Sequence, residues 1–278
     1  MGYCRRDLFR GSLGFILSDN LLTMNYLHEK HVGEAATVLN PDARHSVFLI
    51  CDHASNNIPP EFDNLGVKSA DRQDHVAWDI GTADVTRVLS EELNAPAVLG
   101  SISRLVVDYN RQPDAPDVIA EETHGVVVPG NSGLVSQQRK DRFQRFYNQY
   151  HKTIDQYLSR SGASVLVSIH SFSQDIEPVS RDFDIGLLFD EFEPLARSFA
   201  KHLTKYGLRV RLNEPYSGRA DVISSAQTHG RRYHLPNYEI EINQRLVSTH
   251  LKTLAFGRKM VPAVAWLGQA AQQPGYCR

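Results

Sequence analysis

Two histidines follow directly after short, mostly apolar runs that are typical of buried strands. Residues 165–169 read Val-Leu-Val-Ser-Ile and precede His170, and residues 47–51 read Val-Phe-Leu-Ile-Cys and precede Asp52 and His53. The carboxyl ends of the strands in an open α/β sheet lie along one edge, and that edge is where ligands bind. Two imidazoles at this edge indicate a metal site or an acid–base site.

A metal site at this edge would need a third ligand. Two neutral imidazoles and one carboxylate form a common catalytic zinc site, which leaves a fourth position for water. Asp71, Asp74 and Asp79 are the candidates for the carboxylate. Their segment also begins a predicted helix, where acidic residues are common because they cap the helix and complement its dipole. The residues alone therefore leave the choice among the three open.

Two arginines flank residues 105–109, which we predict to form a strand. Arg104 and Arg111 are too far apart on an extended chain to make one contact jointly. They suit two tasks, namely binding a substrate carboxylate through paired hydrogen bonds and stabilising an oxyanion. The alternative is that both make ordinary surface salt bridges.

Glu239 and Glu241 lie on the same face of a predicted strand at residues 238–242. Two glutamates between apolar residues need partners or a nearby metal if that face is buried. One of them could then act as a general base toward an activated water. The alternative is an exposed sheet face. The turn-rich loop at 213–218 adds Asn213, which turn chemistry does not explain.

The composition limits the class of protein. The chain has 278 residues, of which 41% are hydrophobic and 22% charged, and its net charge is -2. Such a balance is ordinary for a globular protein and gives no field that would attract nucleic acid or anionic membranes. No apolar stretch approaches the ~20 residues of a membrane span. The cysteines at positions 4, 51 and 277 form no disulfide framework, so we expect a reducing compartment, the cytoplasm.

The elements that must position these residues alternate between strand and helix, which predicts an α/β sheet covered on both faces. The aromatic and aliphatic positions between 143 and 158 keep helical spacing, with Ser136 as a cap and Gly162 as the end. Further strands are predicted at 97–100, 185–189 and 208–212, and further helices at 80–93, 193–206 and 248–266, the last kinked or broken by Pro262.

Seven segments, in order between about residues 47 and 246, resemble the N-formylglutamate amidohydrolase family. They are Cys-Asp-His-Ala-Ser-Asn-Asn-Ile-Pro, Ser-Arg-Leu-Val-Val-Asp-Tyr-Asn-Arg, Val-Pro-Gly-Asn, Ile-His-Ser-Phe, Asp-Ile-Gly-Leu-Leu-Phe-Asp, Asn-Glu-Pro-Tyr-Ser-Gly and Glu-Ile-Asn-Gln. The resemblance implies a three-layer α/β/α fold with a mixed, mostly parallel sheet, related to zinc carboxypeptidases. It also implies hydrolysis of N-formyl-L-glutamate to glutamate and formate in bacterial histidine breakdown.

The resemblance also assigns roles at the site, with one Zn²⁺ per chain and a small acidic N-acyl amino acid as the substrate, and it leaves the oligomeric state open. His53 and His170 resemble the metal histidines, and Glu241 resembles the family's terminal glutamate, which we expect to act as general base. Asn56 stands where a ligand glutamate would follow the first histidine, so we favour Asp79 as the third ligand. We expect the oxyanion to be stabilised by Arg104 and the substrate carboxylate to be bound by three residues: Asn110, Arg111 and Asn213.

Asn243 stands where the family pattern has arginine, and this departure keeps two alternatives open. The chain could hydrolyse a different N-acyl amino acid or a short peptide, or it could be a metal-free binding protein on the same fold. For the domains, we expect residues 1–37 to be a mobile N-terminal extension and 38–278 a single catalytic domain. Residues 1–23 only faintly imitate a signal peptide, and Met24 could be the working start.

Overall fold

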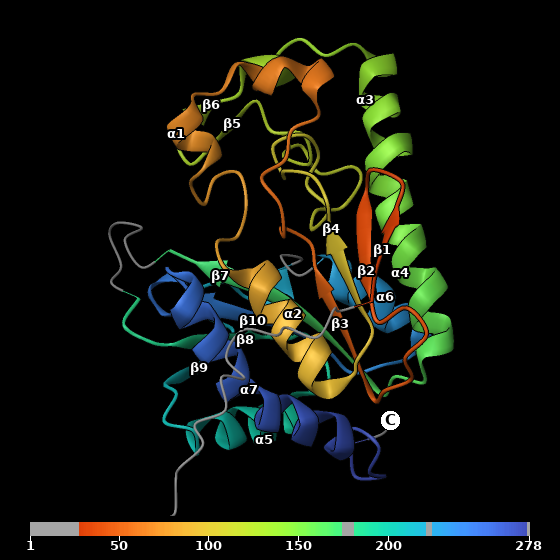
Figure 1. The fold of residues 1–278 in the computed structure, drawn as a ribbon, viewed down its shortest axis with the longest axis vertical. Helices are drawn as coiled ribbons and strands as arrows, with labels where there is room; N and C mark the ends of the chain where they lie inside the picture. The colour runs from red at the N-terminus through yellow and green to blue at the C-terminus, as the bar shows by residue number, and fades with distance from the viewer. Residues whose placement is uncertain (1–27, 174–180, 221–223, 277–278) are drawn as a thin grey trace, which may run out of the picture.

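An eight-stranded sheet forms the centre of the computed structural model, which describes residues 28–173, 181–220 and 224–276 (Figure 1). The strand order is β1-β2-β4-β3-β7-β10-β8-β9. The central strands β4, β3, β7 and β10 are parallel, and antiparallel pairs join β1 to β2, β2 to β4 and β10 to β8. The bounds are β1 Glu29–Val32, β2 Ala36–Leu39, β3 Val47–Cys51, β4 Ala97–Gly100, β7 Val165–Phe172, β8 Ile185–Leu188, β9 Val210–Leu212 and β10 Asn237–Asn243.

Helices cover both faces of this sheet, so the predicted α/β fold with a mixed, mostly parallel sheet is confirmed. The first face carries α2 (Thr82–Leu93), α5 (Glu193–Thr204) and α7 (His250–Ala270). The second face carries α4 (Asn148–Ser161), which continues from α3 (Ser136–Arg142) through a π-helical turn at Phe143–Tyr147, and α6 (Ser224–Tyr233). No helix among the described residues is long and apolar enough to span a membrane.

Strand β3 shows why the sheet must be covered twice. All five of its residues are buried. Val47, Leu49 and Cys51 belong to the core under α2 and α7, whereas Phe48 and Ile50 belong to the core under α4. Because successive side chains of a strand point to opposite faces, an uninterrupted apolar run requires apolar partners on both sides. The same run ends at Asp52 and His53, where the chain leaves the sheet.

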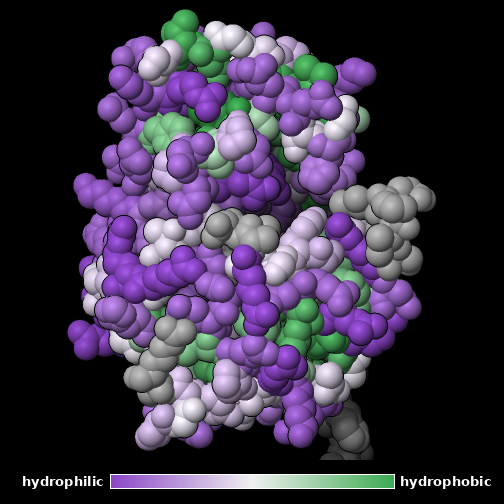
Figure 2. Space-filling model, turned by 180° about the vertical axis from the view of Figure 1, so that it is seen from behind, coloured by the Kyte–Doolittle hydropathy of each residue, from purple (hydrophilic) through white to green (hydrophobic). Residues whose placement is uncertain are grey.

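A lobe projects beyond the carboxyl ends of the central strands. It contains residues 53–80, with the 3₁₀ helix Pro60–Gly66 and α1 (Ser69–Arg72), and residues 104–135, with the hairpin of β5 (Glu122–Thr123) and β6 (Val126–Val127). Figure 1 shows α1, β5 and β6 at its top, in the direction in which β3 and β4 run. Seen from behind, hydrophilic side chains surround a hollow between this lobe and the sheet (Figure 2).

The predicted strand at residues 105–109 is wrong. This segment is buried but forms a loop, because side chains rather than a neighbouring strand satisfy its backbone. Asn131 Nδ2 donates to the carbonyl of Leu105 at 2.9 Å, and Arg142 Nη1 donates to the carbonyl of Val106 at 3.0 Å. The spacing of apolar residues indicates that a segment is buried. It cannot show that polar side chains from distant segments, and not a neighbouring strand, bind its backbone groups.

Other boundaries differ in detail. Gly162 ends α4 in a left-handed conformation at φ 71°, as predicted. Helix α7 continues through Pro262 as one helix, so the proline does not break it. Strands β1 and β2 extend the main sheet, and the domain boundary expected after residue 37 therefore divides β2. Residues 1–27 lie outside the described part of the chain.

Candidate metal centre

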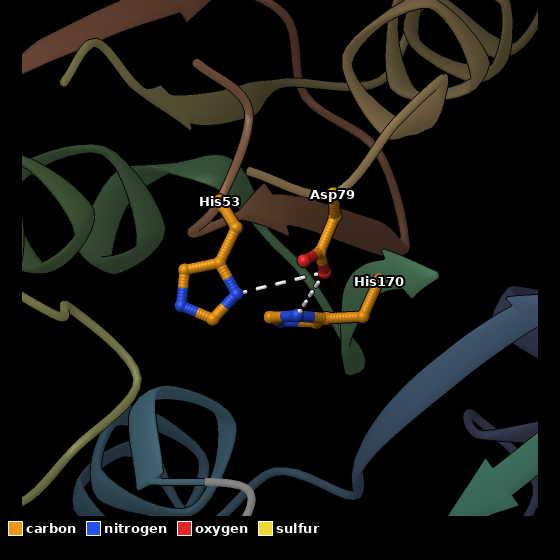
Figure 3. Close-up of side chains that lie close together, drawn as sticks. All are labelled: His53, Asp79 and His170. Atoms are coloured by element: carbon orange, nitrogen blue, oxygen red, sulfur yellow. Dashed lines mark hydrogen bonds and ion pairs between the residues drawn. The ribbon is translucent and has the colours of Figure 1, made fainter. Parts of the chain in front are cut away.

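His53, Asp79 and His170 lie together just past the carboxyl end of the sheet (Figure 3). Asp79 Oδ2 is 2.9 Å from Nδ1 of His170 and 3.5 Å from Nδ1 of His53. All three residues are buried, with at most 4% of their surface exposed. The pair predicted from the sequence therefore does converge. Of the three candidate carboxylates, Asp79 is the one that lies beside the two histidines.

Three separate elements deliver these side chains. His53 follows β3, and its carbonyl accepts a hydrogen bond from the backbone N–H of Asp79 at 3.0 Å. That bond places Asp79 beside His53 shortly before α2 begins. His170 lies near the end of β7, which pairs with β3 in parallel. The site is thus held by the strand ladder and one loop contact.

The donor atoms fit a divalent metal ion. Bonds of ~2.0–2.1 Å to a tetrahedral zinc place neighbouring ligand atoms ~3.4 Å apart, and the distances to Asp79 of 2.9 and 3.5 Å are close to this. The Nδ1 atom of His53 is buried and makes no hydrogen bond. A buried polar atom without a partner is costly unless something else binds it. A cation between the two Nδ1 atoms and Asp79 would satisfy it.

The opposite nitrogen of each imidazole is held by another carboxylate. Nε2 of His53 contacts Asp108 Oδ1 at 2.7 Å, and Nε2 of His170 contacts Asp52 Oδ2 at 3.0 Å. Because an ionised carboxylate can only accept, Nε2 of His53 carries a proton, and Nδ1 of that ring presents a lone pair when the ring is neutral. His170 lies between two carboxylates, Asp52 and Asp79, so a metal would replace the proton on its Nδ1 while Nε2 keeps its own. Metal-binding histidines commonly use this arrangement. Asp52 and Asp108 fix the tautomers that a metal requires.

The electrostatics of the cluster also favour a cation. Burial opposes ionisation of Asp79, but the neighbouring His53 and His170 outweigh it and hold the pKa of that carboxyl well below its usual range. Burial likewise opposes protonation of His170, but Glu239, Asp52 and Asp79 raise its pKa well above the ordinary value. The carboxylates around the two buried imidazoles therefore stabilise positive charge at this point, which a proton supplies here and a bound cation could supply instead.

Strand β10 brings two glutamates to the same place. Its register pairs Glu241 with His170 on β7, so both side chains stand at the same level of the sheet. Glu239 Oε2 accepts a hydrogen bond from Asn110 Nδ2 at 2.9 Å, whereas Glu241 Oε2 is buried without a hydrogen-bond partner. Burial, and then the charge of Glu239, raises the pKa of Glu241 to about 8. The predicted shared face is therefore buried, and Glu241 is the carboxyl free to bind a proton.

His170, Glu239 and Glu241 form a second possible ligand set. Glu239 Oε2 lies 3.5 Å from Nε2 of His170. That nitrogen already contacts both Asp52 and the hydroxyl of Ser168, at 3.0 and 2.9 Å. A metal there would have to displace both contacts, so the chemistry of the donors favours the set that contains His53 and Asp79.

Arg104 lies against the metal-ligand cluster. Its Nε and Nη2 atoms donate to Asp108 at 3.1 and 2.7 Å, and Nη1 lies 3.6 Å from Asp79 Oδ1. Burial opposes its charge, but Asp108 and Asp79 outweigh burial, and the pKa of the guanidinium is raised. Arg104 is therefore a fixed cation beside the proposed ligands.

A cavity of about 220 Å³ opens above these groups. Its walls hold Arg111, whose Nε donates to Asp117 at 2.8 Å, and Asn110, whose amide is bound to Glu239. The remaining lining residues include His75, His124, Phe172, Ser173 and Tyr216. A larger cavity of about 770 Å³ lies at the amino end of β7 and β10, but none of the predicted site residues lines it.

Three asparagines that the sequence singled out do not line this cavity. Asn213 Oδ1 accepts the backbone N–H groups of Phe189 and Gly218, at 2.9 and 3.2 Å, and so stabilises the turn after β9. Asn243 Nδ2 donates to two backbone carbonyls in the segment before β8. Asn56 Nδ2 donates to the carbonyl of Arg72 and the side chain of Gln73.

Sequence reasoning missed Asp52 and Asp108 as residues of the site. Asp52 is adjacent to His53, and Asp108 lies in the segment that was singled out for its arginines. The available signal for Asp52 was its position between a buried apolar run and the candidate ligand His53. Its role became visible only when the Nε2 contacts could be measured.

Comparisons with known proteins identify the family and the fold of the chain. The family model described as N-formylglutamate amidohydrolase matches residues 45–248. The crystal structure of a gene product from Agrobacterium tumefaciens is 30% identical, covers 87% of this chain and 97% of that one, and superposes with a TM-score of 0.82. The N-formylglutamate amidohydrolase from Ralstonia eutropha is 16% identical, covers 86% and 98%, and has a TM-score of 0.65. No curated protein matches the chain significantly.

Proposed function

Because the chain belongs to the N-formylglutamate amidohydrolase family, we propose that it is a metal-dependent hydrolase that cleaves the amide bond of an N-acyl amino acid. The substrate that we propose is N-formyl-L-glutamate, which gives L-glutamate and formate. The observation that carries the proposal is the convergence of His53, Asp79 and His170 beside the unpartnered carboxyl of Glu241. Such a constellation combines a ligand set with a general base.

The metal that we propose is one Zn²⁺ per chain, held by Nδ1 of His53, Nδ1 of His170 and a carboxylate oxygen of Asp79. When bound, it would supply Lewis-acid polarisation of the substrate carbonyl and a lowered pKa for water. Two imidazoles and a carboxylate are the donors that suit zinc. The complete donor set also speaks against a metal-free binding protein, because the unpartnered Nδ1 of His53 would then serve no purpose.

Residues of the chain would perform the other steps. Glu241 would accept a proton from the attacking water and deliver it to the leaving nitrogen, which requires a carboxylate within reach of both atoms. Arg104, held in place by Asp108, would stabilise the negative charge that develops on the carbonyl oxygen. Arg111 lies in the cavity wall and would bind the substrate carboxylate, with Asn110 beside it.

Metal analysis combined with a release assay tests this function. We expect purified protein to contain about one zinc per chain and to release formate from N-formyl-L-glutamate faster than it cleaves N-acetyl- or N-succinyl-glutamate. Faster cleavage of another acyl group would keep the metal-dependent hydrolase and replace the substrate. Protein that binds neither Zn²⁺, Mn²⁺, Co²⁺ nor Fe²⁺ and releases no product would contradict the proposal.

Because Asn243 stands where the family pattern has arginine, a broader panel of substrates should also be assayed. Asn243 is fully buried and bonds to backbone, so it offers nothing to a ligand. A chain that lacks this cation must recognise the substrate with other groups of the cavity. We therefore also propose N-acyl derivatives of other amino acids, and short peptides, as alternative substrates.

A further inference from the structure

The depth of the cavity can be followed through the exposure of its lining residues. His53, His170 and Asp79 are almost fully buried and form its floor. The side chain of Arg111 is 28% exposed, and that of His75 is also 28% exposed. His124 is exposed yet still lines the cavity. If the scissile amide lies on the floor, His124 lies where the opposite end of the substrate must be.

His124 occupies the tip of the β5–β6 hairpin in an unusual backbone conformation. His124 and Gly125 both have positive φ angles, 49° and 77°, as the central residues of a two-residue hairpin turn. Such turns strongly prefer Asn-Gly, because asparagine and glycine adopt this conformation readily. Histidine also adopts this conformation, and here it directs the imidazole of His124 into the lining of the cavity.

The hairpin is anchored so that its tip is held over the cavity. At its base, the N–H of Val128 donates to the carbonyl of Glu121 at 2.8 Å, and Val128 is fully buried. Asn131 Nδ2 also donates to the carbonyl of Ala120 at 2.6 Å. Near the tip, the ring of His124 meets the ring of His75 edge to face, with centroids 5.2 Å apart. His75 in turn pairs with Asp74 at 3.0 Å.

Positive charge surrounds His124. Partial burial lowers the pKa of its imidazole, and the charges of His75, Arg104, Arg111 and Arg181 lower it further. Of these groups, Arg104 and Arg111 line the cavity together with His124, and they are paired with Asp108 and Asp117 respectively. The acidic groups Asp79, Glu239 and Glu241 lie at the cavity floor, so the arginines and His124 are the groups of the lining that suit a substrate carboxylate.

We propose that His124 contacts the end of the substrate farthest from the scissile amide and, with the cations around it, selects substrates that carry a carboxylate there. The imidazole N–H would donate a hydrogen bond to that carboxylate, and His75 would orient the ring. This inference rests on the proposed function, because it places the amide on the cavity floor. It goes beyond that function by assigning a specificity-determining residue to the hairpin.

The matched pair N-formyl-L-glutamate and N-formyl-L-glutamine tests the proposal, because the two differ only in the charge of the side-chain end. Gly and Asn both tolerate the left-handed turn, so His124→Gly and His124→Asn remove the imidazole without disturbing the fold. Loss of a hydrogen bond to a charged group should raise KM for the glutamate substrate about tenfold in His124→Gly. We expect kcat, and KM for the glutamine substrate, to stay nearly unchanged.

Val127→Ala provides the control, since Val127 is 57% exposed on the same hairpin but does not line the cavity. A KM that rises equally for both substrates, or no more than in Val127→Ala, would overturn the role of His124. If the wild-type protein cleaves neither substrate, calorimetric binding of L-glutamate and L-glutamine separates the two proposals. Weaker binding of glutamate alone in His124→Gly supports this inference, and unchanged binding refutes it.

Discussion

At the scale of single residues, the site is defined by which polar atoms lack a partner. Three atoms of the site, Glu241 Oε2, His53 Nδ1 and Asp52 Oδ1, are buried without hydrogen bonds, and the first two face the proposed metal and substrate. Buried polar atoms without partners are rare in folded proteins, and each one needs an explanation. Here a bound cation and a transferred proton explain the first two, which is why we place the chemistry at these two atoms.

Replacing Glu241 with glutamine should remove the proton acceptor while keeping the size and shape of the side chain. We expect kcat to fall by roughly 10²–10⁴-fold, which is the usual contribution of a general base, with metal content unchanged by elemental analysis. Glu92→Gln, at an exposed pair with Arg258, is the matched control. Retained turnover in Glu241→Gln would remove Glu241 from its role.

Replacing Asp108 with asparagine should weaken metal binding without removing a ligand. The amide cannot hold Nε2 of His53 as a carboxylate does, and it also loses the ion pair to Arg104. Groups that orient metal ligands typically change metal affinity about 10–100-fold. Competition with a chromophoric chelator measures this affinity, with Asp141→Asn on α3 as the control. An unchanged affinity would show that Asp108 does not orient His53.

The sequence predicted single residues of the site best at positions where a polar side chain follows directly after an apolar run. That pattern identified His53 and His170, whereas Glu241 was found because it alternates with isoleucines inside β10 and shares a face with Glu239. Asn213 was singled out because turn chemistry did not explain it, but its side chain accepts two backbone N–H groups. Local sequence cannot show that a side chain is already occupied by a contact with another loop.

At the scale of elements, helices α4 and α6 carry a pair of histidines behind the site, half-buried His151 and buried His229. His151 Nδ1 lies 2.9 Å from Nε2 of His229, and His229 Nδ1 lies 2.8 Å from Asp155. His151 Nε2 also contacts the carbonyl of Tyr109 at 3.1 Å. Burial, and then the charge of His229, lowers the pKa of His151 to about 4.

This lowered pKa predicts a loss of stability in mild acid. Because His151 binds a proton more weakly in the folded than in the unfolded chain, its contribution is complete above its ordinary pKa of 6.5 and is lost as the pH falls toward 4. The full loss is about 3 kcal/mol. Urea unfolding between pH 7 and 4.5 should show a shallower pH dependence for His151→Gln than for wild type, while His28→Gln, at an exposed position, should match wild type. Equal slopes for His151→Gln and wild type would contradict this origin.

The elements were predicted well where one face repeats at a fixed period and poorly where contacts are distant. The aromatic stripe from Phe143 to Leu158 gave the long helix and its end at Gly162. The hairpin of β5 and β6 has only two paired residues per strand, which is too short for any period to appear. Sequence patterns therefore could not predict this hairpin, although we propose that its tip determines substrate specificity.

At the scale of the whole molecule, an ion that binds only the folded chain should stabilise it. Saturation at 100 times the dissociation constant contributes about 2.7 kcal/mol, which corresponds to roughly 5–10 °C in the unfolding temperature of a chain of this size. We expect a chelator to lower that temperature and added Zn²⁺ to restore it, as followed by scanning calorimetry. His53→Ala should respond to neither treatment. An equal response in this variant would place the stabilising ion elsewhere.

The ligands of the centre come from distant parts of the chain, and this has a consequence for the time at which the centre forms. Asp79 and His170 are 91 positions apart, and β3 must pair with β7 before their side chains meet. A growing polypeptide that has left the ribosome only as far as α4 therefore contains two of the three proposed ligands, His53 and Asp79, and lacks His170. We therefore expect uptake of the proposed metal to be a late event of biosynthesis that follows the pairing of β3 with β7.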